Sequence, residues 1–219
     1  MTTATKPREL PIIFSTPMVR AILDDRKTQT RRVIKPSRYM QKYAAGKWGG
    51  WDSPIQANEA AALAYQILTT QGERRGVQPG DLLWVKETWA EFCRNESCFD
   101  GCTCEGNDTY IEYKADSPRA EAPGGWDELP IYERPPWGRW KSPRFMPKRA
   151  ARIWLEVIDV RAERVQDISE ADAKAEGFES VYDFLTYFYE VNKHKIPAGS
   201  SPWVFAYTFK RVEREDGKG

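Results

Sequence analysis

The chain has 219 residues, of which 41% are hydrophobic and 13% aromatic, enough for one well-buried core with insertions. Its 33 basic and 32 acidic residues leave a formal net charge of +1, so bulk charge does not indicate a nucleic-acid-binding protein. No apolar run approaches the roughly 18 residues of a membrane span, and the N-terminus lacks the apolar stretch of a signal peptide. We therefore expect a cytoplasmic protein with no membrane partner.

The first predicted elements are a short strand and a helix. Residues 10–15 have the composition of an opening strand. Thr16-Pro17 predicts the helix start, because a threonine hydroxyl can cap free amides and proline is tolerated at the first helical position. Apolar residues follow at helical spacing, and Asp24-Asp25 ends the helix. From residue 37 to 80 the sequence becomes loop-like and alanine-rich, which suggests a helical insertion.

The middle of the chain predicts strands separated by a long connection. Residues 82–89 form a strand pattern in which Glu87 shares a face with Leu83, Val85 and Trp89. Residues 109–115 form a second strand pattern, and the proline-rich residues 116–148 form an irregular connection.

The last third predicts two strands around two helices. Residues 151–164 alternate like a long strand, and Ser169 to Asp172 has the spacing of a capping box that starts a helix ended by Gly177. An aromatic helix covers residues 182–191, and the strand 203–212 places aromatic residues at alternate positions on one face. We therefore expect an α+β domain, or a small mixed barrel.

The segment from Leu23 to Arg32 is the most informative for function. Lys27 and Thr30 are three residues apart, so a helix end or turn would let them point the same way, whereas a regular strand would not. A threonine hydroxyl is a weak nucleophile until a neighbour accepts its proton, and a lysine with a lowered pKa beside arginines could accept it. Alternatively, Thr28 or Thr30 satisfies only backbone groups. The carboxylates that could assist are Glu176, Glu170 and Glu87, which sequence separation does not rank.

The other constellations leave alternatives open. Four cysteines lie within one twelve-residue stretch and could close a structural zinc site, or remain unligated thiols: Cys93, Cys98, Cys102 and Cys104. His194 is the only histidine and lies in a polar run, so a general base must come from lysine, glutamate, aspartate or tyrosine. No glycine-rich phosphate loop is present, which disfavours nucleotide hydrolysis.

Cations and aromatics interleave in a pattern that suits single-stranded RNA or a flipped nucleotide. They are Arg31, Arg32, Lys35, Arg144, Lys148, Arg149 and Arg152, with Trp137, Trp140, Phe145 and Trp154. The alternative is that these aromatics belong to the core and the cations to a solvated rim.

Six motifs along the chain form a recognisable set: residues 11–23, 26–32, 80–89, 145–152, 168–177 and 202–205. Taken together, they resemble a phage or prophage protein of the ASCH superfamily. The resemblance implies one domain over residues 1–219, with insertions at about 37–79 and 93–140. It also implies an α+β fold: a small mixed β-barrel of the PUA type with short helices packed on it.

The resemblance also implies an activity. Shorter bacterial members are 4-acetylcytidine amidohydrolases that use a lysine, a threonine and a glutamate, and their motifs are similar to Leu23-x-x-x-Lys27-Thr28-x-Thr30-x-Arg32 and Ser169-Glu170-x-x-Ala173-x-x-Glu176. The catalytic residues then fall on Lys27, Thr30 and Glu176, and no catalytic cofactor is implied. Asp25 stands where relatives usually have glycine, which aspartate tolerates in a left-handed turn at some strain.

We therefore predict a hydrolase directed at a modified nucleoside or RNA, in which Thr30 attacks the acyl carbon and Lys27 takes and returns the proton. Arg32 and a backbone amide would stabilise the oxyanion. The predicted substrate-binding residues are Arg32, Arg31, Thr28, Trp84 and Glu87. The alternative is a non-catalytic RNA- or nucleotide-binding module of a phage, in which a tryptophan stacks a base.

Overall fold

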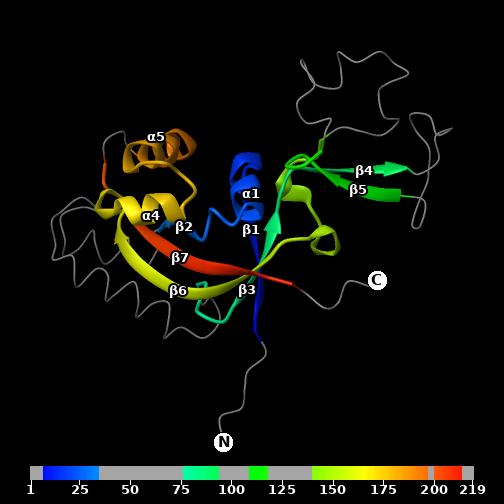
Figure 1. Ribbon diagram of the computed structural model, residues 1–219, viewed down its shortest axis with the longest axis horizontal. Coiled ribbons are helices and arrows are strands. Elements are labelled where there is room, and N and C mark those ends of the chain that lie inside the picture. Colours follow the sequence, from blue (N-terminus) through cyan, green and yellow to red (C-terminus); the bar gives the residue numbers. More distant parts are fainter. Residues whose placement is uncertain (1–6, 35–75, 94–108, 118–139, 197–199, 214–219) are drawn as a thin grey trace, which may run out of the picture. The chain divides into compact units, whose positions relative to one another are not determined.

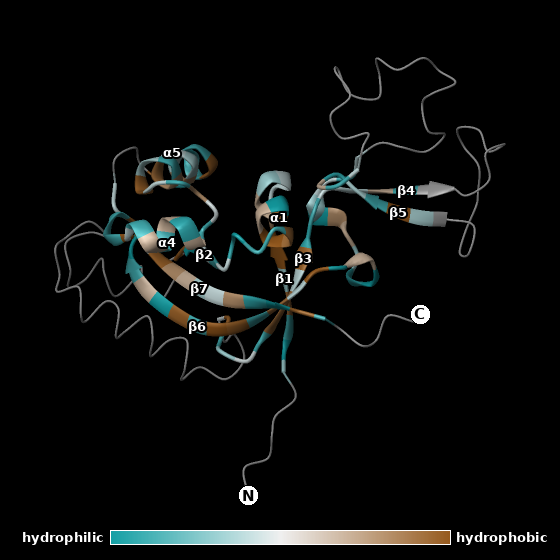
Figure 2. Cartoon of the chain, viewed as in Figure 1, coloured by the Kyte–Doolittle hydropathy of each residue, from teal (hydrophilic) through white to brown (hydrophobic). Residues whose placement is uncertain are grey.

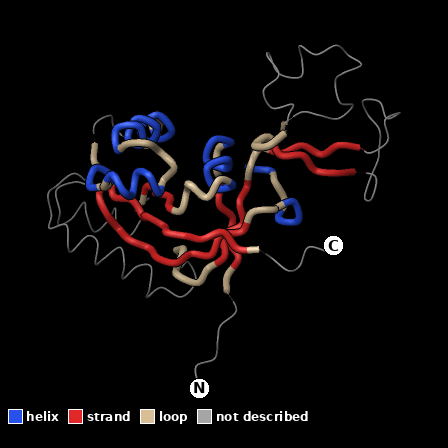
Figure 3. Tube along the Cα trace, in the orientation of Figure 1, coloured by secondary structure: helices blue, strands red, loops and turns tan. Residues whose placement is uncertain are grey.

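Strands and short helices follow one another in the computed structural model, which describes residues 7–34, 76–93, 109–117, 140–196 and 200–213 (Figure 1; Figure 3). The strands are β1 (Glu9–Ile13), β2 (Gln29–Val33), β3 (Leu82–Lys86), β4 (Trp89–Cys93), β5 (Thr109–Tyr113), β6 (Trp154–Arg164) and β7 (Trp203–Val212). The α-helices are α1 (Thr16–Leu23), α4 (Glu170–Ala175) and α5 (Val181–Asn192), and 3-10 helices span Pro143–Phe145, Lys148–Ala150 and Val165–Asp167. These elements confirm the predicted α+β class. None of the described helices is long and apolar enough to cross a membrane.

The larger sheet is mixed, with the strand order β1-β3-β6-β7-β2, and β4 pairs with β5 in a separate two-stranded sheet. β1 runs parallel to β3, whereas β2 is antiparallel to β7 and β4 to β5. A barrel requires the two edge strands to pair with each other. Among the described residues, β1 and β2 are edge strands without such pairing, so the sheet is open and the predicted barrel closure is not formed by these strands.

The chain divides into two compact units, each built from segments far apart in the sequence. Unit 1 contains Met1–Arg8, Arg26–Asp81 and Glu156–Lys210, and unit 2 contains Glu9–Asp25, Leu82–Leu155 and Arg211–Gly219.

Unit 1 contains an apolar cluster to which α4 and α5 both contribute. Phe184 and Phe188 are four residues apart, so they share one face of α5, and their ring centroids are 5.6 Å apart. The other buried members are Val165, Ile168, Ala173 and Val204. Polar and apolar residues alternate along β6 and β7 (Figure 2), as expected of strands with faces in different surroundings.

The core of unit 2 includes the apolar face of α1, whose buried residues are Met18, Val19, Ala21 and Ile22. The N-cap of this helix is Ser15, so Thr16 is the first helical residue rather than the predicted cap. Pro17 follows in the first turn, where its missing N–H leaves no helical hydrogen bond unmade.

The single strand predicted over residues 82–89 is two strands in the structure. β3 ends at Lys86 and β4 begins at Trp89, because the first pairs in the five-stranded sheet and the second with β5. Glu87 lies at the break and is 1% exposed, and the other residues predicted to share its face, Leu83, Val85 and Trp89, are buried as well.

Candidate functional site

The turn between α1 and β2 carries Lys27 and Thr28. Asp25 has a φ of 55°, which confirms the left-handed conformation predicted for it. The Thr28 N–H donates to the carbonyl oxygen of Ala175 at 2.8 Å, and the Thr28 carbonyl oxygen accepts from the Phe209 N–H at 2.9 Å. These two bonds hold the turn between the end of α4 and strand β7, while the Thr28 side chain remains exposed.

Glu176 is the C-cap of α4, and the backbone sets its position. The Phe178 N–H donates to the Ala173 carbonyl oxygen at 3.0 Å, and the Gly177 N–H donates to that of Lys174 at 2.9 Å. This pair of bonds is the Schellman motif. Gly177 has a φ of 90°, which glycine adopts without a Cβ clash, and its predicted role in ending the helix is confirmed.

Lys27 and Glu176 form a buried ion pair across 149 residues of sequence. The Lys27 Nζ donates to Glu176 Oε2 at 2.5 Å and to the Glu176 carbonyl oxygen at 2.8 Å. Each residue is 3% exposed. Because the carbonyl groups at a helix end lack intrahelical donors, Lys27 satisfies the helix end as well as the carboxylate.

The surroundings of Lys27 favour its neutral form. Burial lowers the pKa of Lys27 below its ordinary value of 10.5, because the ammonium loses its solvating water. The charge and hydrogen bond of Glu176 raise this pKa, and the charges of Arg32 and Arg31 lower it. Burial is the largest of these effects, so the free amine is more accessible here than in an exposed lysine, as a lysine base requires.

Thr30 and Arg32 lie on one face of β2, two residues apart. Thr30 is 4% exposed and pairs with Tyr207 of β7, whereas Arg32 is partly buried and pairs with Phe205. The rings of Phe205 and Tyr207 stack with centroids 6.2 Å apart, which confirms that these alternate aromatics share a face. Burial lowers the pKa of Arg32, and the charge of Glu176 opposes this effect. The structure thus places a hydroxyl and a cation side by side on β2, with Glu176 close enough to influence that cation.

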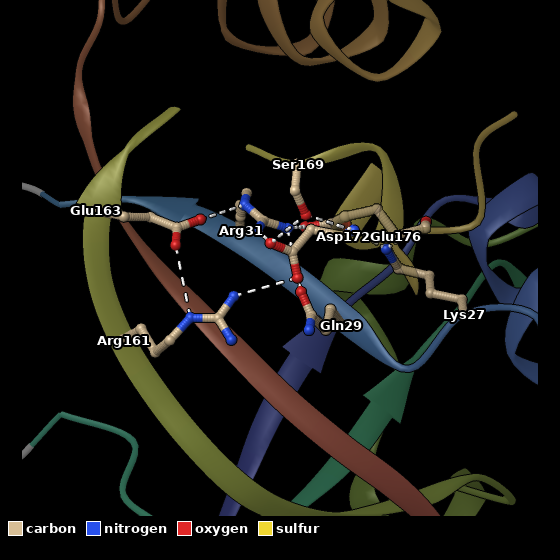
Figure 4. A network of polar contacts seen from close by, with 8 residues as sticks. All are labelled: Lys27, Gln29, Arg31, Arg161, Glu163, Ser169, Asp172 and Glu176. Atoms are coloured by element: carbon tan, nitrogen blue, oxygen red, sulfur yellow. Dashed lines mark hydrogen bonds and ion pairs between the residues drawn. The ribbon is translucent and has the colours of Figure 1, made fainter. Parts of the chain in front are cut away.

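Arg31 lies on the alternate face of β2 and is the centre of a buried polar network (Figure 4). Its side chain is 0% exposed, and it donates from Nε to Glu163 and from Nη1 to Glu176. Figure 4 shows the Arg31 guanidinium among the carboxylates of Glu163, Asp172 and Glu176, with Lys27 on the far side of Glu176. The structure therefore brings together three predicted residues: Lys27, Arg31 and Glu176.

Four residues of this network had no predicted part in the site: Gln29, Arg161, Glu163 and Asp172. Strand alternation held a partial signal, because Arg161 and Glu163 are two residues apart in β6. Asp172 was predicted only as the last residue of the capping box that starts α4, and its N–H donates to Ser169 Oγ at 3.1 Å as that prediction requires. Its ion pair with Arg31 depends on tertiary packing, which local spacing does not encode.

Two predicted binding residues, Trp84 and Glu87, belong to unit 2. Both Glu87 carboxylate oxygens accept hydrogen bonds from Arg152, from Nε at 2.9 Å and from Nη2 at 3.0 Å. Arg152 also pairs with Asp116 and lies 4.0 Å from the ring centroid of Tyr113. Burial raises the pKa of Glu87, although Arg152 opposes this shift. Glu87 therefore fixes the position of Arg152, which in turn contacts Asp116 and Tyr113.

Replacing Glu87 by alanine is expected to destabilise the protein by about 3 kcal/mol, because a buried ion pair loses one partner. The midpoint of denaturant unfolding would measure the loss. Asp116→Ala is the matched control, since the Asp116 side chain is 54% exposed and binds the same arginine. The control is expected to cost less than about 1 kcal/mol. Equal losses in the two variants would contradict this role for Glu87.

The cysteine cluster lies largely outside the described residues. Cys93 ends β4, and the positions of Cys98, Cys102 and Cys104 fall in the undescribed range 94–108. Within the described ranges, no group of three or more histidine, cysteine, aspartate or glutamate residues could hold a metal ion. The structural zinc site stays a prediction.

Comparisons with known proteins do not identify the family. No protein-family model matches the chain, and no curated protein matches it. A crystal structure of an Enterococcus faecalis V583 protein, described by the family model DUF984, is 9% identical with a TM-score of 0.41, over 98% of this chain and 86% of that chain. A crystal structure of an ASCH domain from Lactobacillus crispatus JV V101 is 12% identical with a TM-score of 0.39, over 94% of this chain and 81% of that chain. Likenesses this weak establish neither fold family nor function.

Proposed function

We propose that the protein is an amidohydrolase that removes an acyl group from a modified cytidine such as 4-acetylcytidine, as a nucleoside or within RNA. The observation that carries this proposal is the buried contact of 2.5 Å between Lys27 Nζ and Glu176 Oε2. It joins two residues that the ASCH-like motifs assign to catalysis. The third, Thr30, lies on the strand that follows the Lys27 turn.

Lys27 is the general base of the proposed reaction. A neutral amine has two N–H donors and one lone pair. Glu176 accepts the two donated hydrogen bonds through Oε2 and its carbonyl oxygen, so the lone pair of the neutral form can accept a proton. Attack requires the Thr30 hydroxyl to come within hydrogen-bond reach of this amine when substrate is bound.

Thr30 is the nucleophile. Its oxygen forms a bond to the acyl carbon as Lys27 takes the hydroxyl proton, and the carbonyl oxygen becomes an oxyanion stabilised by Arg32 and a backbone amide. The carbon–nitrogen bond then breaks, and Lys27 returns the proton to the leaving amine of the cytosine. Water hydrolyses the acyl–Thr30 ester with Lys27 again as base, which releases the carboxylic acid and restores the threonine.

Incubation of the purified protein with 4-acetylcytidine, followed by chromatographic separation of cytidine, tests the proposal. The expected result is cytidine formation by the wild type and its loss in Lys27→Ala and Thr30→Ala proteins. Absence of deacetylation by folded wild-type protein, or equal rates in the variants, would overturn it.

A second candidate function is RNA binding without catalysis, favoured by an exposed cationic segment of unit 2. Phe145 is 72% exposed, and the side chains of Arg149 and Lys141 are 71% and 45% exposed. Glu91 Oε2 lies 3.5 Å from Lys141 Nζ, and Glu91 Oε1 lies 3.8 Å from Arg149 Nη2, so one carboxylate pairs with two cations. An exposed ring and exposed cations in one segment suit base stacking and phosphate contact.

This candidate predicts RNA affinity that falls with salt and with Arg149→Ala but survives Thr30→Val. Fluorescence titration with single-stranded RNA at two salt concentrations measures it. Binding of this kind by a wild-type protein without deacetylase activity would favour the second function over the first.

A further inference from the structure

The Glu176 carboxylate is shared between two cations. Oε2 accepts from Lys27 Nζ, and Oε1 accepts from Arg31 Nη1 at 3.2 Å. Because each oxygen has its own cationic donor, rotation of the carboxylate would break one of the two bonds. The Arg31 side chain is 0% exposed and that of Glu176 is 3% exposed, so water has little access to replace a lost partner.

Arg31 is itself held by further acceptors. Its Nε donates to Glu163 Oε1 at 2.7 Å, and its Nη1 also donates to Gln29 Oε1 at 3.3 Å. Its Nη2 lies 3.3 Å from Asp172 Oδ2, an ion-pair contact without the geometry of a hydrogen bond among the described residues. Figure 4 shows these groups gathered around one guanidinium. Arg31 therefore holds Glu176 from a fixed position.

The charges alternate outward from Lys27. Glu176 follows it, then Arg31, and then Asp172 and Glu163, which both contact Arg161. Arg161 Nη2 lies 3.3 Å from Asp172 Oδ1, and the Arg161 side chain is 39% exposed. Burial raises the pKa of Asp172, but the hydrogen bond from Ser169 and the charge of Arg31 outweigh it and lower the pKa overall. The positive charge of Arg31 thus helps to keep Asp172 ionised, and Asp172 in turn offsets part of that charge.

If Lys27 were the only partner of Glu176, loss of its proton would leave a buried carboxylate unpaired, which is costly. Arg31 removes that cost because Glu176 keeps a cationic partner in both protonation states of Lys27. We propose that Arg31 is a positioning residue of the hydrolytic site: it keeps the Glu176 carboxylate turned toward Lys27 while Lys27 gains and loses its proton, and Asp172 partly offsets the positive charge of Arg31. The catalytic part of this inference rests on the proposed function.

The charged groups around Lys27 determine in which direction the Lys27 pKa should move when one of them is removed. Arg31 and Arg32 face it from β2, and Glu176 faces it from the end of α4. Tyr207 of β7 and Tyr187 of α5 interact electrostatically with Arg32. Removing the positive charge of Arg31 should favour the protonated form of Lys27. Removing the negative charge of Asp172, which partly offsets that of Arg31, should disfavour the protonated form.

The experiment compares Arg31→Gln and Asp172→Asn by NMR titration of the Lys27 side chain and by the pH dependence of kcat/KM. Arg31→Gln is expected to raise the pKa of Lys27 by about one unit, because a cation next to its partner is lost. Asp172→Asn is expected to lower it, and by less, because Asp172 acts through Arg31. The rising limb of kcat/KM should move with the titration in each variant.

A merely structural role for the network would reduce the amount of folded protein but would not move the Lys27 titration in opposite directions. Shifts of the same sign, or no shift in either variant, would overturn the inference. If Arg31→Gln fails to fold, Asp172→Asn with its partly exposed side chain still tests it, because an unchanged or raised Lys27 pKa would contradict the expectation. If the wild-type protein has no deacetylase activity but the Lys27 pKa shifts in opposite directions in the two variants, the proposed function is overturned while this charge arrangement is supported.

Discussion

Thr30→Val is expected to reduce deacetylation of 4-acetylcytidine by roughly a thousandfold or more, with little change in fold. Valine has nearly the shape of threonine, and Thr30 lies in β2, where a β-branched residue fits the strand. The change removes the hydroxyl that would form the acyl ester. Steady-state formation of cytidine measures the loss.

Two further variants control for the loss of a hydroxyl on the sheet. Thr208→Val removes a hydroxyl from β7, where Thr208 is partly buried and pairs with Gln29 of β2, and it should leave the rate within about threefold of wild type. Thr30→Ser keeps the hydroxyl and should retain measurable activity. A Thr30→Val protein as active as Thr208→Val would remove Thr30 from the mechanism.

Lys27→Met is expected to lower kcat by about 10²–10⁴-fold, the range typical of a lost general base. Methionine keeps much of the side-chain volume but has no basic nitrogen, and Glu176 keeps Arg31 as its partner. The deacetylation rate should also lose the part of its pH dependence that comes from Lys27. Rate measurements on protein shown to be folded by circular dichroism test this.

The matched control is Lys174→Met, because Lys174 lies exposed in α4 two residues before Glu176. It removes a lysine from the same helix and should leave the rate unchanged. A comparable loss in Lys174→Met would assign the effect to the charge of the helix rather than to a base.

Local sequence patterns predicted the elements that depend on neighbouring residues. The Ser169 cap and the left-handed Gly177 were predictable because both ends of α4 are set by hydrogen bonds within a few residues. Alternation predicted the long strands β6 and β7, because successive side chains of a strand point to opposite faces whichever strand pairs with it. It did not predict the break after Lys86, because that break depends on which partner each half of the segment finds.

The candidate site was predictable only in part. Motif resemblance associated Lys27 with Glu176, and the structure gives their contact, which periodicity could not supply across 149 residues. The enclosure of Arg31 by Glu163 and Asp172 was not predicted, because it requires β6 and α4 to meet β2 in three dimensions. Sequence alternation places Arg31 and Arg32 on different faces of a strand, but it does not say which face receives the carboxylates.

The pH dependence of kcat/KM for 4-acetylcytidine, corrected for uncatalysed hydrolysis, tests the central claim most directly. Only neutral Lys27 can accept the Thr30 proton, and burial lowers the pKa of Lys27, so the rate should rise with pH and level off with a midpoint below 10.5. Lys27→Met should lack this limb. A wild-type rate that does not exceed the uncatalysed rate would contradict the account. So would a wild-type rate that shows no rise with pH below 10.5.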